Sequence, residues 1–263
     1  MIQIVSILFT VVLIAIILHK YSEPLSLRKM TLTGIFLSIA LVLTMYSINL
    51  MIFGGQVVVR FSQLALIILG ASLGPVYGLV GSLGFDILNL MIFPLGSFYF
   101  GFTLTNIMVS LLPALAFQFM KKHKESFNLS IMIFTGLAYI VYIITVLILS
   151  IVSLNVEDLT AKAISTNVIG FVIIFLLVFM GSLFYIKRKG IKLNNDLIMF
   201  ITSAILVEFI VQGFLTPLWL HDMYQTPIII SMQIRAIKGL IMVALNSSLG
   251  YPIYKLTKKI AVK

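Results

Sequence analysis

Five charged side chains interrupt otherwise apolar stretches of this sequence, and they are its best candidates for binding a charged ligand. They are Arg60, Asp86, Glu208, Arg235 and Lys238. A charge within a long apolar segment is costly to bury, so it usually faces a cavity or an opposite charge. Arg235 and Lys238 are three residues apart, which places both on one face of a helix.

The two acids each share a helix face with an amide: Asp86 with Asn89, and Glu208 with Gln212. Two interpretations of the five charges remain open. In the first, they line an outward-facing pocket for a polar or anionic ligand, with Arg235 and Lys238 as counter-charges. In the second, they simply pair, for example Asp86 with Lys238, and lock the helices together.

Aromatic residues gather at the same level of the chain as these charges: Phe98, Tyr99, Phe100, Phe102, Trp219 and Tyr224. Trp and Tyr near a helix end serve either as anchors at a membrane interface or as platforms for a planar ligand. Both interpretations of Trp219 stay open, and a ring-bearing substrate favours the second.

Several catalytic patterns are absent or out of context. The chain has no cysteine, and its three histidines are far apart. Gly70-Ala-Ser-Leu-Gly74 has the letters of a nucleophile elbow but lies in an apolar helix, where its glycines instead favour close helix packing. No phosphate-binding loop motif is present, so ATP-driven transport requires another subunit. We expect no enzyme, no metal and no cofactor.

Composition identifies the elements that must position these residues. Of 263 residues, 61% are apolar and only 10% are charged, against about 25% charged in soluble domains. A water-soluble enzyme is therefore nearly excluded, and an all-α integral membrane protein is expected. Runs long enough to cross a bilayer, together with Gly and Pro breaks, predict nine segments. These are Met1–Leu18, Met30–Phe53, 62–73, 76–93, 101–120, Leu129–Leu154, Ala163–Ile186, Leu197–Leu218 and Pro227–Tyr254.

The distribution of basic residues predicts the orientation. With nine segments, fourteen cations fall on one side of the membrane: Lys20, Arg28, Lys29, Lys121, Lys122, Lys124, Lys187, Arg188, Lys189, Lys192, Lys255, Lys258, Lys259 and Lys263. Because cytoplasmic loops are enriched in Lys and Arg, the N-terminus is predicted outside and the C-terminus in the cytoplasm of a multi-pass cell-membrane protein. The net charge of +10 is then a topology signal, and no nucleic-acid partner is expected.

Two blocks of motifs, in this order and spacing, resemble a known family. The first contains Val59-Arg-Phe, Gly74-Pro75, Asp86, Phe93-Pro-Leu-Gly96 and Phe100-Gly-Phe-Thr-Leu104. The second contains Thr216-Pro-Leu-Trp-Leu220, Tyr224-Gln-Thr-Pro227 and Arg235-Ala-Ile-Lys238. Over about 30–120 and 196–256, the chain resembles the substrate-binding S component of energy-coupling-factor vitamin transporters, most closely the folate branch. The family's usual Pro-Gly-Phe-Thr-Leu begins with Phe100 here.

The resemblance implies a fold and a division of the chain. The family core has six helices, which here are four in 30–120 and two in 196–256. Residues 1–20 then form an extra N-terminal helix and 129–186 an inserted helix pair. The small residues Gly34 and Ser38 hold the four-residue spacing at which the family docks its coupling subunit.

The resemblance also implies a function, namely capture of a folate-like vitamin from outside for ATP-driven uptake. The implied partners are this ligand, a transmembrane coupling subunit, two ATPase subunits and the lipid bilayer. The expected substrate-binding residues are Arg60, Asp86, Phe98, Tyr99, Thr103, Trp219, Tyr224, Arg235 and Lys238. The alternatives are an S component for another ring-bearing or anionic nutrient and an intramembrane hydrolase or lipid-modifying enzyme.

Overall fold

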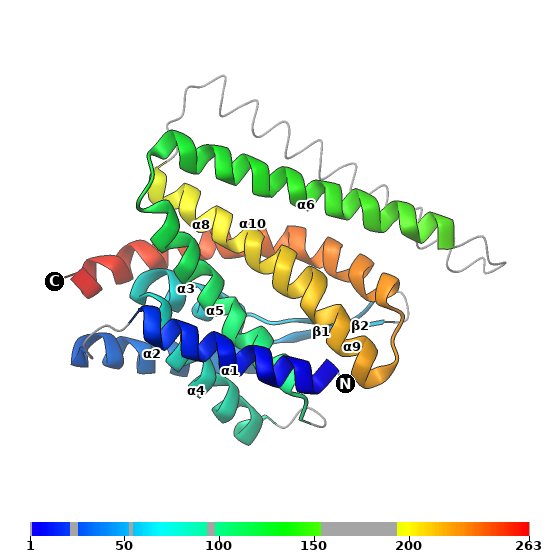
Figure 1. The fold of residues 1–263 in the computed structure, drawn as a ribbon, viewed down its shortest axis with the longest axis horizontal. Helices are drawn as coiled ribbons and strands as arrows, with labels where there is room; N and C mark the ends of the chain where they lie inside the picture. The colour runs from blue at the N-terminus through cyan, green and yellow to red at the C-terminus, as the bar shows by residue number, and fades with distance from the viewer. Residues whose placement is uncertain (1, 22–25, 53–54, 94–97, 154–193, 263) are drawn as a thin grey trace.

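The computed structural model describes residues 2–21, 26–52, 55–93, 98–153 and 194–262, and most of them are helical (Figure 1). Its helices are α1 (Ile2–Lys20), α2 (Leu27–Met45), α3 (Ser62–Leu73), α4 (Pro75–Ile92), α5 (Phe100–Met120), α6 (Glu125–Ser153), α8 (Asn195–Leu206), the π-helix η1 (Val207–Leu215), α9 (Thr216–Tyr224) and α10 (Ile228–Val262). Two strands, β1 (Ile48–Ile52) and β2 (Gly55–Val59), complete the described elements.

Seven helical segments of the described chain are long and apolar enough to cross a membrane, as in a multi-pass membrane protein. They are α1, α2, α4, α5, α6, the continuous helix Asn195–Tyr224 made of α8, η1 and α9, and α10. The predicted short helix at 62–73 is also confirmed as α3. Its 12 residues extend only about 18 Å, less than a bilayer core. The predicted segment Ala163–Ile186 lies outside the described residues.

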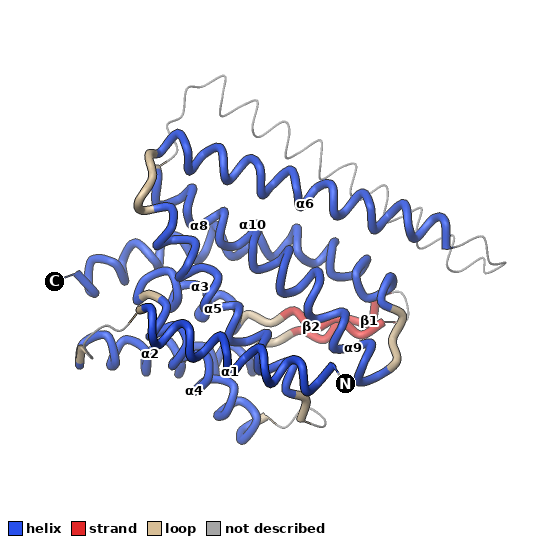
Figure 2. Tube along the Cα trace, in the orientation of Figure 1, coloured by secondary structure: helices blue, strands red, loops and turns tan. Residues whose placement is uncertain are grey.

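The predicted helix Met30–Phe53 is wrong in its last third. The helix α2 ends at Met45, and the chain then forms an antiparallel hairpin in which Ile48 lies opposite Val59 (Figure 2). A short apolar run does not distinguish a strand from a buried helix by its periodicity. Three consecutive β-branched residues, Val57 to Val59, favour the strand. The all-α class therefore holds except for this hairpin.

The break between α3 and α4 is confirmed at Gly74-Pro75. Gly74 has φ 93°, a conformation that glycine adopts without strain, and Pro75 is the first residue of α4. Close packing at the neighbouring glycines is also confirmed. A Cβ on Gly70 would overlap the backbone carbonyl of Ser110 on α5, and one on Gly78 would lie 2.9 Å from the Ser110 hydroxyl oxygen.

The helix α3 lies at the centre of the described fold, packed against α2, α4, α5 and α10. Almost all of its residues are buried, and they form one apolar core with Phe117 on α5, Phe200 on α8 and Tyr254 on α10. Two helices pack around this centre. The N-terminal α1 packs on α4 and α5, and α6 packs on α8 and α10 (Figure 2).

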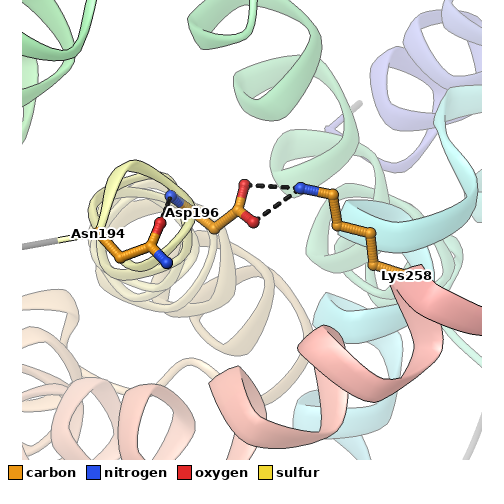
Figure 3. Close-up of polar contacts among 3 residues, drawn as sticks. All are labelled: Asn194, Asp196 and Lys258. Carbon is orange, nitrogen blue, oxygen red and sulfur yellow. Dashed lines mark hydrogen bonds and ion pairs between the residues drawn. The ribbon is translucent and has the colours of Figure 1, made fainter.

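One end of the fold collects the basic residues of several segments. The end of α1, the start of α2, the turn between α5 and α6, and the C-terminus all lie on the left in Figure 1. There Lys121 is close enough to Lys29 and Lys258 to interact with both electrostatically. Lys258 also forms an ion pair of 2.7 Å with Asp196, whose backbone N–H is capped by Asn194 (Figure 3).

Candidate functional site: a charged cluster inside the bundle

The five charged residues singled out in the sequence are linked by electrostatic interactions in the structure. Arg60 follows β2 and interacts with Asp86 on α4, while Glu208 on η1 interacts with Arg235 and Lys238 on α10. Arg60 also interacts with both of these α10 cations. We call these five residues the charged cluster. Asp86, Glu208 and Lys238 are buried, and Arg60 and Arg235 are half-buried.

Glu208 is the most enclosed member of the charged cluster, with a side chain 1% exposed. The amide nitrogen of Gln63, at the start of α3, donates a hydrogen bond to its Oε1. Its Oε2 has no hydrogen-bond partner among the described residues. Lys238 is its strongest electrostatic partner.

Arg235 and Lys238 share one neutral acceptor. Arg235 Nη1 donates to Gln212 Oε1 at 3.0 Å, and Lys238 Nζ donates to the same oxygen at 3.4 Å. An amide oxygen satisfies a donor but does not cancel a charge. Arginine has five N–H donors and an ammonium group has three, so most of this donor capacity remains for other partners.

Asp86 accepts a hydrogen bond of 2.6 Å from the amide of Asn106 on α5. Within the described chain it forms no ion pair with Lys238, so the example that the sequence offered for simple pairing is wrong. The carboxylate that interacts electrostatically with Lys238 is that of Glu208. Asn89, one turn after Asp86, has a buried amide oxygen with no hydrogen-bond partner in the described structure.

The charged cluster contains three cations and two carboxylates, and its cations repel one another. An uncompensated positive charge in an apolar interior is unfavourable, because the low dielectric strengthens repulsion and water is not available to solvate it. A negatively charged group would relieve this cost. The arrangement therefore favours an anionic occupant.

The π-helical form of η1 positions two of the residues just described, Glu208 and Gln212. Sequence reasoning predicted this span as an ordinary helix and missed the wider turns. A signal was present, because Pro217 has no N–H to donate to the carbonyl of Gly213, four residues earlier. At the end of η1, Thr216 donates through its backbone N–H and its hydroxyl to the carbonyl of Val211, five residues back. Such π segments are frequent at functional sites.

Tyr99 and Trp219 form a second, aromatic group toward the other end of the fold from the basic residues. Their rings lie 6.1 Å apart, and both side chains are buried. Tyr99 donates to Asp222 at 2.7 Å, and the indole N–H of Trp219 donates to Thr105 at 3.2 Å. Burial and the hydrogen bond to Asp222 raise the pKa of Tyr99 above its ordinary value, because both favour the protonated hydroxyl.

The remaining expected substrate-binding residues divide by exposure. Thr103 on α5 is buried, and its hydroxyl has no hydrogen-bond partner in the described part of the chain. Phe98 and Tyr224 are 54% and 55% exposed, so neither side chain is enclosed as Thr103 is. Trp219, in contrast, is buried against Gly101, where a Cβ would lie 2.6 Å from the indole.

Two tyrosines of α6 reach the charged cluster, and sequence reasoning missed both. Tyr139 interacts electrostatically with Glu208, and Tyr142 with Arg235. Gly239 permits this approach, since a Cβ there would overlap the Tyr139 hydroxyl and lie 3.4 Å from Glu208 Oε2. Both tyrosines lie in a segment that the family resemblance treats as an insertion, so no motif singled them out.

The small pair Gly34 and Ser38 lies on an exposed face of α2. No heavy atom lies within 4 Å of a Cβ built on Gly34. Ser38 donates a hydrogen bond back to the Gly34 carbonyl at 3.0 Å, so its hydroxyl is satisfied within its own helix. This face is open to lipid or to another protein.

The fold and the charged cluster define a class: a helical protein with multiple membrane-spanning segments and a net-positive polar centre. The described residues include no group of three or more His, Asp or Glu side chains that could hold a metal ion. Neither a model of a known protein family nor a curated protein matches this chain.

Proposed function

We propose that this protein is a membrane subunit that captures a folate-like vitamin from outside, as an S component of an energy-coupling-factor transporter. The observation that carries the proposal is the net-positive charged cluster within the helices. Folates carry carboxylates and a flat ring system. The cations of α10 would bind a carboxylate. Of the buried aromatic pair, Trp219 lies on α9, which continues η1, and Tyr99 directly precedes α5.

The arrangement of helices supports the division of the chain into core and additions. The elements α2, α3, α4, α5, α8–η1–α9 and α10 correspond to the six helices of the family core. The helices α1 and α6 pack around them. The inserted pair would then consist of α6 and the predicted segment Ala163–Ile186, which lies outside the described residues.

The proposed partners are a transmembrane coupling subunit and two ATPase subunits, which supply the energy that this chain has no motif to provide. The open face around Gly34 and Ser38 is the proposed contact with the coupling subunit, because small residues allow helices to approach closely. The basic end of the fold would face the cytoplasm, and Asp222 the outside.

The test begins with the ligand retained by the full-length protein purified in detergent. Mass spectrometry should identify a folate-like compound. Trp219 is the single tryptophan, so its fluorescence reports binding directly. Titration with folic acid should quench it saturably in the wild type. If a different organic anion is retained, the protein still binds a ligand as proposed, but the ligand is not a folate. Absence of both a retained organic anion and a response to folic acid would contradict the proposal.

A further inference from the structure

The helix α6 makes its closest polar contact with η1, the segment that carries Glu208 and Gln212. The hydroxyl of Tyr142 donates to the backbone carbonyl of Gly213 at 2.8 Å. Both residues are buried. This contact links an element outside the proposed family core to the backbone of η1, the segment that carries Glu208.

The carbonyl of Gly213 lies where Pro217 interrupts the ladder of backbone hydrogen bonds: in an α turn the missing N–H would serve Gly213, and in a π turn it would serve Gln212. In an α-helix, the carbonyl of residue 213 accepts from the N–H of residue 217, but Pro217 has none. A buried carbonyl without a donor costs free energy comparable to a lost hydrogen bond. Tyr142 gives the Gly213 carbonyl a donor from another helix, one that Pro217 cannot provide in an α turn.

The ring of Tyr142 is itself held against η1. Phe209 and Phe214, near the two ends of η1, lie 5.4 Å and 4.9 Å from it between ring centroids. Tyr139, one turn earlier on α6, stacks on it at 6.1 Å with an interplanar angle of 11°. The hydroxyl is therefore aimed at Gly213 by packing on three sides.

Gly213 directly follows Gln212, the shared acceptor of Arg235 and Lys238, and it follows Glu208 by one π turn of five residues. A change of η1 from π to α geometry would rotate both side chains relative to α10. Fixing the carbonyl of Gly213 therefore fixes the acceptors that hold the two cations.

We propose that Tyr142 is a positioning residue, which holds η1 in its π form through Gly213 and so sets the geometry of the charged cluster, making α6 part of the binding site. Its role in ligand binding rests on the proposed function, whereas its control of η1 does not. The experiments separate the two.

The first experiment needs no ligand. Thermal unfolding of the full-length protein is followed for the wild type, Tyr142→Phe, Pro217→Ala and the double variant. Tyr142→Phe should lower the melting temperature. It should lower it less in the Pro217→Ala background, because the N–H of an alanine at this position can donate to the Gly213 carbonyl once this segment takes an α turn. An equal loss in both backgrounds would show that the hydroxyl does not compensate for Pro217 and would overturn the proposal.

The native-state emission of Trp219 gives a second ligand-free readout. Trp219 lies four residues beyond η1, so a change in the turn of η1 alters its environment. Well below the melting temperature, Tyr142→Phe should shift this emission, while Tyr251→Phe on α10 should not. Unchanged emission would mean that the hydroxyl stabilises the fold without positioning the site.

Folic acid binding then tests the site itself. Tyr142→Phe should weaken binding roughly tenfold, the equivalent of one lost hydrogen bond near the cations, and Tyr251→Phe should leave it unchanged. Full affinity in Tyr142→Phe would overturn the positioning role. If the wild type does not bind folic acid, the proposed vitamin is wrong. The role of Tyr142 in holding η1 is then decided by the two ligand-free measurements, namely the melting temperatures with and without Pro217→Ala and the emission of Trp219.

Discussion

Arg235 and Lys238 donate hydrogen bonds to the same neutral acceptor, so this acceptor does not balance their positive charge. Both donate to the amide oxygen of Gln212, which leaves their charge to be balanced by Glu208 and by whatever occupies the site. Sequence reasoning identified both cations from their spacing. It could not find Gln63 or Tyr142, because an uncharged side chain on another segment carries no signal of what it faces.

Removing either cation should weaken binding strongly. For Arg235→Ala and Lys238→Ala we expect a loss of about 2–5 kcal/mol in the free energy of folic acid binding, a factor of roughly 30 or more, since each loses a charged hydrogen bond. Trp219 fluorescence titration measures it. Lys255→Ala, at the exposed basic end, is the matched control and should bind normally.

Simple pairing within the charged cluster makes a different prediction. Lys238→Met would lower the melting temperature by leaving Glu208 uncompensated, and adding Glu208→Gln would restore it, as in a double-mutant cycle. Asp86→Asn would not restore it, because Asp86 is bonded to Asn106 instead. If Glu208→Gln restores the melting temperature of Lys238→Met, and none of these variants changes the affinity for folic acid, the charged cluster stabilises the fold and does not bind the ligand.

Gly239 should tolerate no side chain, because a Cβ there would overlap the Tyr139 hydroxyl. Gly239→Ala is expected to lower the free energy of unfolding by about 1–3 kcal/mol, as overpacking does. Gly136→Ala on α6 is the control, since nothing lies within 4 Å of its Cβ. If Gly239→Ala and Gly136→Ala have the same melting temperature, α6 can shift away from α10 at no cost in stability, and the close contact at Gly239 is not required.

The helices of the fold were largely predictable, and the exceptions have physical causes. Gly74-Pro75 marked a break, because a positive φ and a missing N–H both interrupt a helix. The hairpin after Met45 was missed because its residues continue the uncharged run of α2, in which the polar Ser47 and Asn49 did not signal an end to the helix. The π form of η1 was missed because helix periodicity does not separate a π turn from an α turn over nine residues.

The open face of α2 yields a prediction for coupling. Leu at both Gly34 and Ser38 should keep the backbones of two helices apart, and so reduce vitamin uptake in cells with the complete transporter. Both positions are exposed, so the isolated variant should fold and bind folic acid as the wild type does. Equal loss of binding and uptake would show that the pair serves packing within this chain.

The charge distribution of the whole molecule predicted an orientation, and the fold gathers basic residues from three of the predicted cytoplasmic groups. Lys29, Lys121 and Lys258 come from different segments, and Lys121 lies close enough to the other two to be repelled by both. The excess of cations at this end favours the cytoplasmic side. Chemical labelling of introduced cysteines determines which side of the membrane this basic end faces.

Single cysteines test the orientation, since the chain has none of its own. A cysteine at position 124 or 192 should react with an impermeant maleimide only after the membrane is opened, and one at position 160 should react in intact cells. The measurement is the labelled fraction before and after permeabilisation. Labelling of position 124 in intact cells would reverse the predicted orientation, and the proposed capture of a ligand from outside would fail with it.

The enclosure of α3 has a consequence for how the protein is made. This helix is shorter than a bilayer core, and α10 covers one of its sides. Because α10 follows every other described helix in the chain, it leaves the ribosome after them. Until α10 is made, one side of α3 has no helix packed against it. The nascent protein then depends on its insertion machinery to cover this segment, because α3 is too short to span the lipid by itself. A chain that stalls before Ile228 would keep that segment uncovered.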